Sequence, residues 1–587
     1  MKGYFLGLVT LLFVLGQCVL AESYFVSVYG RASGDGSREA PWDLQTALRH
    51  PAVGPGDTVW VAGGRYSGVF YSELSGREGQ VVVVRSIPGQ EVVLDGNVPG
   101  NASGVLNIHG AYSWFWGLTV TNSAATGDAY FKDGVYFVGA NSKLINCRIY
   151  NNGGNGVGFW RPALNAEIYG CVIYHNGYEG TARGHGHGIY SQNESGTKLI
   201  RDNVLFHSYG LGVHIYTENG AIEGYVLEGN VVFNSGIPGA GFIERNVLVG
   251  GMQPADRLVL RDNYFYNRPA FSSKASVQLG YAVPNRNAEF TNNVSVDGSV
   301  YILSGWNALQ LTGNTLYSRS PDMQLLAFDD FAGISRPVFN NNDYYVGSLA
   351  MRSFSDWRDF SGQDAQSSFS ATLPEQSNYH ILTNRYEAQR AHIVVYNWSA
   401  EQSLMINLSG LLEEGADFEI YDVLRMDQAP VLSGEYAGGA VALPLTPSNP
   451  DLPLRAGSFT SLLSTTLPAF GVFLLRSSGH PDSLDLPLVP GAREPLKIIQ
   501  CHPNPTVDLV VLELSVPSSG PLDVKVYDEA GRLVHRETFA VRAGRESLVL
   551  NLSRLGNGVY ILEAGDGKET VQCKVVKRSF AWNPPDN

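Results

Sequence analysis

Short runs of alternating apolar and polar residues recur from about residue 80 to residue 345. Alternation over so few residues predicts β-strands, and no helix-length amphipathic segment separates them. The runs recur about every 20 to 35 residues, an interval typical of a solenoid. Short strands without intervening helices favour a parallel β-helix over helical or leucine-rich repeats. The recognisable runs begin at Cys147, Cys171, Asn203, Asn230, Asn263, Asn293, Asn314 and Asn342.

Asparagine opens most of these runs and therefore occupies the same turn in successive coils. Stacked asparagine amides can hydrogen-bond to one another along the axis of a solenoid, so we expect an asparagine ladder. Cys147 and Cys171 take this position in two earlier coils. We expect them to be a stacked pair of small buried side chains, in preference to a disulfide or a metal site.

A second column of related segments lies ahead of the asparagine column. Strand side chains alternate between the two faces of a sheet, so in each segment one residue faces the core and the next residue faces out. The inward set is Val135, Val157, Ile189 and Val213. The outward set is Tyr136, Gly158, Tyr190 and His214, followed two residues later by Val138, Trp160, Gln192 and Tyr216. Neighbouring coils are about 4.8 Å apart, so these outward residues are predicted to form one surface patch.

The beginning of the array carries its own signature. A strand at Tyr24, a short helix capped by Asp43 and the segment Gly56–Tyr66 (GDTVWVAGGRY) follow one another. This order resembles the N-terminal cap of right-handed parallel β-helix proteins of the pectate-lyase-like superfamily. A cap is physically required because the end of a solenoid exposes apolar side chains and unpaired strand edges. We therefore assign residues 22–350 to a right-handed parallel β-helix with an N-terminal cap.

Residues 351–490 lose the repeat. Phe354–Asp364 is interpreted as a short linker, and alternating segments near residues 391–398, 404–408, 418–422 and 470–475 predict a β-sandwich. No catalytic constellation stands out there. The predicted fold class is therefore all-β: a β-helix, a β-sandwich and a small C-terminal immunoglobulin-like sandwich.

Residues 495–578 contain four blocks in order, namely CHPNP from Cys501, VKVYDEAGRLV from Val524, LSRLGNGVYIL from Leu552 and KVVKR from Lys574. They resemble the type IX secretion system C-terminal sorting domain. That resemblance implies export across an outer membrane, with the type IX machinery as a partner. Such domains end near the last basic residue, whereas this chain continues to Asn587. Cys501 and Cys573 lie near opposite ends of the module and can pair if its terminal strands meet.

The first 21 residues are typical of a secretory signal peptide, with Lys2, an apolar run from Leu6 to Leu15, and Ala21 before the cleavage point. The apolar run is too short to span a membrane stably, and no later segment resembles a transmembrane helix. The predicted location is therefore the cell surface or the medium, reached through the periplasm. A net charge of −14 and the absence of a basic motif argue against nucleic acid as a partner.

The outward patch is the best candidate for chemistry. Members of the resembled superfamily include polysaccharide lyases, hydrolases and epimerases, but also adhesins, so fold alone does not decide. Elimination from a uronic acid needs a base, an acid and a group that neutralises the carboxylate. His214, Tyr190 and Arg183 are the predicted catalytic residues of a polysaccharide lyase. The predicted substrate-binding residues are Tyr136, Trp160, Arg161, His185, His187, Gln192, Asn193 and Tyr216.

Three alternatives stay open. A non-catalytic glycan-binding or adhesive surface protein would use the same aromatic patch. A glycoside hydrolase would need two carboxylates, and the candidates Asp128, Asp133, Glu179, Glu194 and Glu218 form no recognisable pair. A metal site would use His185 and His187 with His207 or His214, but the intervening glycines indicate a turn. We predict no cofactor, with Ca²⁺ the only weak candidate, because acidic residues do not cluster.

Overall fold

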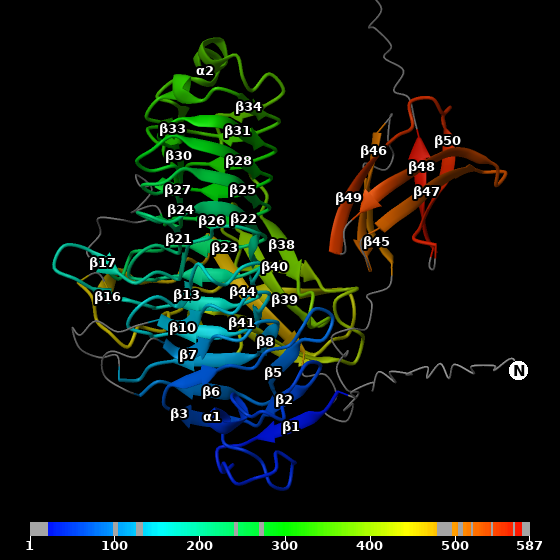
Figure 1. The fold of residues 1–587 in the computed structure, drawn as a ribbon. Coiled ribbons are helices and arrows are strands. Elements are labelled where there is room, and N and C mark those ends of the chain that lie inside the picture. The colour runs from blue at the N-terminus through cyan, green and yellow to red at the C-terminus, as the bar shows by residue number, and fades with distance from the viewer. Residues whose placement is uncertain are drawn as a thin grey trace, which may run out of the picture. The chain divides into compact units, whose positions relative to one another are not determined.

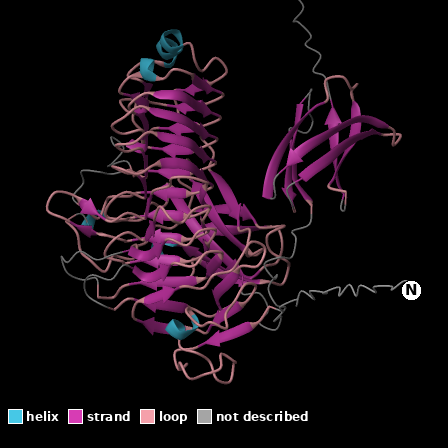
Figure 2. Cartoon of the chain, viewed as in Figure 1, coloured by secondary structure: helices cyan, strands magenta, loops and turns pink. Residues whose placement is uncertain are grey.

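The computed structural model describes residues 21–97, 104–124, 133–239, 245–268, 275–458, 460–477, 496–502, 509–517, 520–541, 544–567 and 570–577. Residues 1–20 of the predicted signal peptide, Asp128 and residues 503–505 of the sorting motif lie outside these ranges. Within them, no helix is long and apolar enough to cross a membrane. Strands dominate, and helices are few and short (Figure 2). The predicted all-β class is confirmed.

Three parallel sheets run the length of a stack of coils and enclose a single core (Figure 1). Sheet A extends from β1 (Ser23–Val26) to β34 (Pro337–Asn340), and sheet B from β3 (Gly64–Ser67) to β37 (Ser368–Ser370). Sheet C contains, in spatial order, β4 (Phe70–Ser72), β7 (Gly104–Ile108), β10 (Asp133–Phe137), β13 (Val157–Phe159), β18 (Ile189–Ser191), β21 (Val213–Ile215), β24 (Val247–Val249), β27 (Ala275–Leu279), β30 (Ser299–Ile302), β33 (Gln324–Phe328) and β36 (Ser348–Leu349).

The register of sheet C agrees with the predicted alternation. Val135 pairs with Val157, Val157 with Ile189, and Ile189 with Val213 in parallel register. All four side chains are fully buried in the core. Because strand side chains alternate, the intervening residues are placed on the outer face of the sheet.

The predicted asparagine ladder runs along the turn between sheets A and B. Each side-chain amide from Asn203 to Asn314 donates to the amide oxygen of the next member at 2.9–3.1 Å. Cys147 and Cys171 precede the ladder as a buried pair of free thiols. The backbone amide of Cys171 donates to Asn203 Oδ1 at 2.9 Å. The ladder ties successive coils together along the axis of the stack.

Short helices close both ends of the β-helix (Figure 1). Helix α1 (Leu44–Ala47) begins after Asp43, whose carboxylate accepts the Thr46 amide at 2.9 Å, as predicted. Helix α2 (Phe354–Ser361) buries Trp357 completely against the opposite end. Trp357 Nε1 donates to the buried carboxylate of Asp364, which also accepts the last ladder amide at 3.0 Å.

The interpretation of residues 354–364 as a linker is therefore wrong. The segment is a cap, and β37 pairs with β35 (Asp343–Tyr345) of sheet B. The parallel sheet thus continues about 20 residues beyond the boundary expected at residue 350. The repeat signal vanishes early because the cap replaces an asparagine by Asp364 and a strand by a helix.

An antiparallel domain packs against the outer face of sheet B. One of its sheets has the order β38 (Asn378–Thr383), β39 (Arg390–Tyr396), β44 (Phe470–Ser477), β41 (Asp417–Asp422) and β42 (Leu432–Glu435), and the other pairs β40 (Ser403–Asn407) with β43 (Ala440–Pro444). Phe470 stacks on Tyr266 with ring centroids 4.3 Å apart, inside a cluster shared by both domains. The β-helix and this domain form one compact unit.

The C-terminal module is a separate unit with its own core. Its sheets are β45 (Lys497–His502), β46 (Leu509–Val516) and β49 (Gly544–Asn551), and β48 (Leu533–Val541), β47 (Gly520–Asp528), β50 (Gly558–Gly565) and β51 (Thr570–Lys577). Strands β45 and β51 contact each other, which brings the free thiols of Cys501 and Cys573 within hydrogen-bonding reach.

Glu167, in β14 (Glu167–Tyr169) of sheet A, joins the two domains of the first unit. Its buried carboxylate lies 2.8 Å from Lys143 Nζ and 3.0 Å from an Arg385 guanidinium nitrogen that belongs to the antiparallel domain. Burial alone would raise the pKa of Glu167, but Lys143, Arg385 and Arg201 together lower that pKa to about 2.

We expect Glu167→Gln to destabilise the first unit by about 3 kcal/mol, because three cations lose their shared carboxylate. Since the folded pKa is below the ordinary 4.5, this stabilisation is complete above about pH 4.5 and is lost as the pH falls toward 2. Denaturant unfolding followed by tryptophan fluorescence, repeated over that range, measures both effects. Glu73→Gln is the control, because its ion pair with Arg49 is exposed. Equal losses from both variants would contradict the assignment.

Candidate functional site

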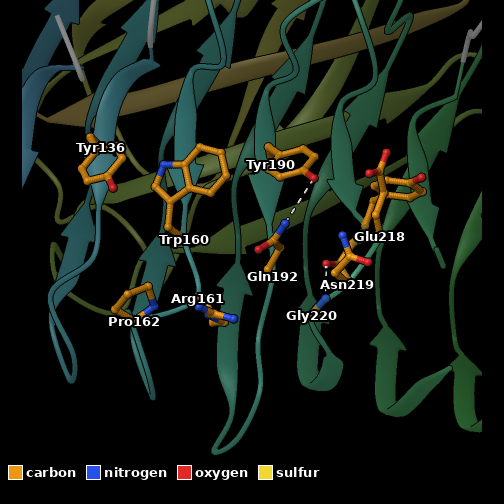
Figure 3. Close-up of a pocket in the computed structure, with 11 residues that line it drawn as sticks. Tyr136, Trp160, Arg161, Pro162, Tyr190, Gln192, Glu218, Asn219 and Gly220 are labelled. Carbon is orange, nitrogen blue, oxygen red and sulfur yellow. Dashed lines mark hydrogen bonds between the residues drawn. The ribbon is translucent and has the colours of Figure 1, made fainter. Parts of the chain in front are cut away.

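A cavity of about 490 Å³ lies on the outer face of sheet C (Figure 3). Its walls come from β10, β13, β18 and β21 and from the loops that follow these strands. It is lined by Tyr136, Trp160, Arg161, Pro162, Tyr190, Gln192, Tyr216, Thr217, Glu218, Asn219 and Gly220. Residues from four successive coils therefore meet in one place, as the parallel register requires.

Aromatic rings form a continuous row through this cavity. Figure 3 shows Tyr136, Trp160 and Tyr190 side by side on neighbouring strands. Adjacent ring centroids along the row are 5.1–6.4 Å apart. The full row is Tyr71, His109, Tyr136, Trp160, Tyr190, His214, Tyr216 and Tyr281. Such a row offers apolar ring faces for the successive rings of an extended sugar chain.

Gly158 interrupts the outward column for a steric reason. A β-carbon at this position would lie 1.9 Å from Asp133 Oδ2 and 2.4 Å from Trp160 Nε1. The glycine therefore leaves space for the Asp133 carboxylate, which accepts Trp160 Nε1–H at 3.1 Å and an Asn155 amide hydrogen at 2.7 Å. These bonds orient the indole ring of Trp160 in the cavity wall.

Tyr190 lies at the centre of the row. Its hydroxyl accepts a hydrogen bond from Gln192 Nε2 at 3.4 Å, and its ring meets that of His214 edge-on at 5.3 Å. Burial raises the pKa of Tyr190, the Gln192 hydrogen bond opposes that rise, and the charge of Glu218 adds to it. The phenol is therefore neutral at moderate pH.

His214 is partly exposed and contacts a second histidine from the preceding coil. Its Nδ1 lies 3.1 Å from Nε2 of His187. Burial and the positive charge of Arg183 lower the pKa of His214 to about 3. Burial, His214 and Arg183 also lower the pKa of His187 well below its ordinary value. Both imidazoles are neutral at physiological pH.

Lys198 supports the site from inside the β-helix, although the sequence pattern does not indicate this role. It opens β19 (Lys198–Arg201) and is fully buried. Its Nζ donates to the backbone oxygens of Phe159, Trp160 and Gln192 at 2.7–2.8 Å. Burial lowers the pKa of Lys198 well below its ordinary value. The three bonds connect the strand ends that carry two cavity residues.

Six of the predicted site residues line the cavity: Tyr136, Trp160, Arg161, Tyr190, Gln192 and Tyr216. Arg161 is exposed and pairs with Glu194 at 2.8 Å. Arg183 and His185 belong to a hairpin of β16 (Tyr178–Glu179) and β17 (Gly184–His185) beside the cavity. Arg183 acts on His214 through its charge, whereas His185 stacks on Tyr178 at 5.0 Å.

Two of the predicted substrate-binding residues are buried. Asn193 has no exposed surface, and its amide donates to the backbone oxygen of Gly224 in the next coil. His187 is only 8% exposed and faces His214. His185 and His187 point in different directions because Gly186 has a φ of +84° and breaks the strand. Within the described ranges, no group of three or more His, Cys, Asp or Glu residues is arranged to hold a metal ion.

His109 is placed in the aromatic row, between Tyr71 and Tyr136. In the sequence, His109 is an isolated histidine without a link to the patch. Its relation to the column is recognisable only from register, because Ile108 pairs with Phe137 and therefore places His109 opposite Val138. The sequence signal was weak because Val138, the residue of the next coil in register with His109, is not aromatic.

Comparison with known proteins agrees with this architecture. Residues 24–245 match the family described as Pel9A-like, right handed beta helix region, and residues 500–578 match the secretion system C-terminal sorting domain. The predicted resemblance to both families is confirmed. The sorting domain indicates export to the cell surface or the medium. No curated protein sequence matches the chain.

Several solved structures resemble the chain. A GH136 lacto-N-biosidase from Eubacterium ramulus is 13% identical, with 60% of this chain and 67% of that chain covered and a TM-score of 0.42. Pectate lyase Pel9A is 17% identical, with 60% of this chain and 77% of that chain covered and a TM-score of 0.36. An alginate lyase from Paenibacillus sp. str. FPU-7 is 19% identical, with 60% of this chain and 99% of that chain covered and a TM-score of 0.32.

We expect Gly158→Ala to displace Trp160 or Asp133, because the added methyl group overlaps both. The emission of Trp160 should change, and the variant should be destabilised by about 1–3 kcal/mol. Difference spectra against Trp160→Phe isolate that emission. Gly556→Ala is the control, because no atom lies within 4 Å of its β-carbon. Unchanged Trp160 emission and stability in Gly158→Ala would refute the packing described.

Proposed function

We propose that this exported protein binds an acidic polysaccharide along sheet C and cleaves it by β-elimination at Tyr190. The β-helix is a carbohydrate-active fold, and the sorting domain directs the protein to where external glycans are found. The fold itself does not select the reaction. The side chains around Tyr190 support this particular reaction.

The observation that carries the proposal is the environment of the Tyr190 hydroxyl. This hydroxyl stands in a cavity between aromatic rings, it is hydrogen-bonded by Gln192, and the His214 ring lies 5.3 Å from its own. A purely adhesive strip needs rings and hydroxyls but no proton-transfer group among hydrogen-bond donors. The combination therefore favours an enzyme over a binding surface.

The proposed reaction uses the Tyr190 phenolate as the base. The phenolate removes the C5 proton of a uronate residue, the C4–O4 bond breaks, and a C4=C5 double bond forms. The resulting phenol then returns that proton to the departing O4, so Tyr190 ends as it began. One group serves both steps when the proton and the leaving oxygen are on the same side of the sugar ring.

Hydrogen-bond donors around the cavity would hold the substrate carboxylate and neutralise its charge. This lowers the pKa of the C5 proton, which is then easier to remove. Gln192 presents an amide beside Tyr190, and the exposed guanidinium of Arg161 lies at the cavity wall. Arg183 adds positive charge near His214. These groups favour an anionic polymer over a neutral one, although the protein as a whole is acidic.

We expect the wild-type protein to release unsaturated uronate products, detected by their ultraviolet absorbance, from at least one acidic polysaccharide. Tyr190→Phe should lower kcat by at least about a thousandfold, because the proton-transfer group is removed while the aromatic ring stays. Tyr301→Phe is the matched control, since Tyr301 is a tyrosine of sheet C three coils beyond His214 and outside the cavity. Reducing ends without unsaturated product would instead support a glycoside hydrolase. Neither product from a broad panel would support the binding protein.

The pH dependence follows from the same assignment. Burial raises the pKa of Tyr190, so the phenolate is scarce at neutral pH and increases as the pH rises. We expect kcat/KM to increase continuously from neutral into alkaline pH. A rate that falls over this range would contradict a phenolate base.

A further inference from the structure

We infer that His187 is a positioning residue that holds His214 as a neutral hydrogen-bond donor, with its proton on Nε2. In this arrangement His214 binds the carboxylate of the polymer and takes no proton from it. The inference rests on the proposed function for its role in the reaction. The arrangement of the two imidazoles is a separate physical claim that can be tested without substrate.

A second ladder runs along sheet C. In one coil, the Asn155 side-chain oxygen accepts the backbone N–H of His187 at 3.0 Å. In the next coil, His187 Nδ1 accepts the backbone N–H of Leu211 at 2.9 Å. His187 thus takes the acceptor position that an asparagine oxygen has one coil earlier. A backbone amide can only donate, so His187 Nδ1 carries no proton.

The space around His187 is built for this contact. A β-carbon at Gly210 would lie 2.7 Å from His187 Nδ1, so only glycine lets the chain approach the ring so closely. The Gly210 backbone N–H donates to the Gly186 oxygen at 2.7 Å, which holds the two coils together at this point. The Leu211 amide is therefore a fixed donor.

The Leu211 amide determines both tautomers. A neutral imidazole without a proton on Nδ1 carries it on Nε2. His187 Nε2–H consequently donates to His214 Nδ1, 3.1 Å away. His214 then has its lone pair on Nδ1 and its own proton on Nε2. One backbone amide thus determines the state of two histidines.

The same contacts disfavour the charged forms of both histidines. A proton on His187 Nδ1 would face the Leu211 N–H, and a proton on His214 Nδ1 would face the His187 N–H. Burial and the charge of Arg183 lower the pKa of both imidazoles. The other groups around His214 are the rings of Tyr190 and Tyr216, which are neutral at moderate pH. Both histidines should therefore stay neutral over the working range.

His214 Nε2 is available to a ligand. Within the described residues it has no hydrogen-bond partner, and it is not among the fully buried polar atoms that lack one. His214 also lies between Tyr190 and Tyr216, which both line the cavity. A neutral N–H at this place can bind the substrate carboxylate and stabilise the charge that develops on it. It cannot act as a base, which leaves proton transfer to Tyr190.

The direct test is ¹⁵N NMR of the full-length protein labelled selectively at histidine. We expect the His187 and His214 signals to show an unprotonated Nδ1 and a protonated Nε2, unchanged from about pH 5 to pH 8. Spectra of His187→Asn and His214→Asn assign the signals. His535→Gln, in the separate C-terminal unit, is the control and should leave the His187 and His214 signals unchanged. A proton on His214 Nδ1, or titration of His214 near its ordinary pKa, would overturn the inference.

His187→Asn tests the positioning role, since its side-chain oxygen can still accept the Leu211 amide as Asn155 does for His187. The variant loses only the donor to His214. We expect the His214 signals to change toward a mixture of the two tautomers, because its Nδ1 loses the His187 donor, and kcat/KM to fall about tenfold. An unchanged His214 spectrum in this variant would contradict the positioning role.

The two proposals fail in different ways. If the wild-type protein shows no lyase activity but the spectra show the expected tautomers, the proposed function is wrong and the arrangement of the histidines stands. If unsaturated products form but His214 carries its proton on Nδ1, the proposed reaction stands and this inference is wrong. Thermal unfolding of His187→Asn near the wild-type temperature confirms that the comparison is between folded proteins.

Discussion

The molecule depends on hydrogen bonds that run along the axis of the stack, from each coil to the next. The asparagine ladder supplies them at one turn, and backbone pairing supplies them in the three sheets. Because these bonds fix the register, a residue in one coil is always beside the equivalent residue of its neighbours. A surface such as the aromatic row can therefore be assembled from short strands that are 20 or more residues apart in sequence.

The candidate site uses the same device in a more specialised form. The column of Asn155, His187 and Leu211 connects coils through side-chain acceptors and backbone donors, as the asparagine ladder does. Substitution of an imidazole for an amide retains the acceptor and adds a second nitrogen that reaches His214. A structural ladder can thus acquire a chemical role by a single exchange. Lys198 holds the opposite side of the site from within the core.

Much of this could be predicted from sequence because the period of a strand and the repeat of a coil are local signals. The inward Val135 and outward Tyr190 followed from alternation alone. The burial of Asn193 could not be predicted, since it depends on the turn of the next coil. Lys198 was missed because a charged residue at the start of a strand is usually exposed, and here three carbonyls from other segments enclose it. The cap at Trp357 resembled a linker because its partner, Asp364, is recognisable only in the fold.

The proposed function requires an acidic polymer to lie along sheet C with a uronate residue at Tyr190. A crystal structure of the Tyr190→Phe protein with an acidic oligosaccharide would show whether the polymer binds there. We expect sugar rings over Tyr136, Trp160 and Tyr216, with one carboxylate within hydrogen-bonding distance of His214 Nε2. An oligosaccharide bound to another sheet, or one that crosses sheet C without contact to residue 190, would contradict it.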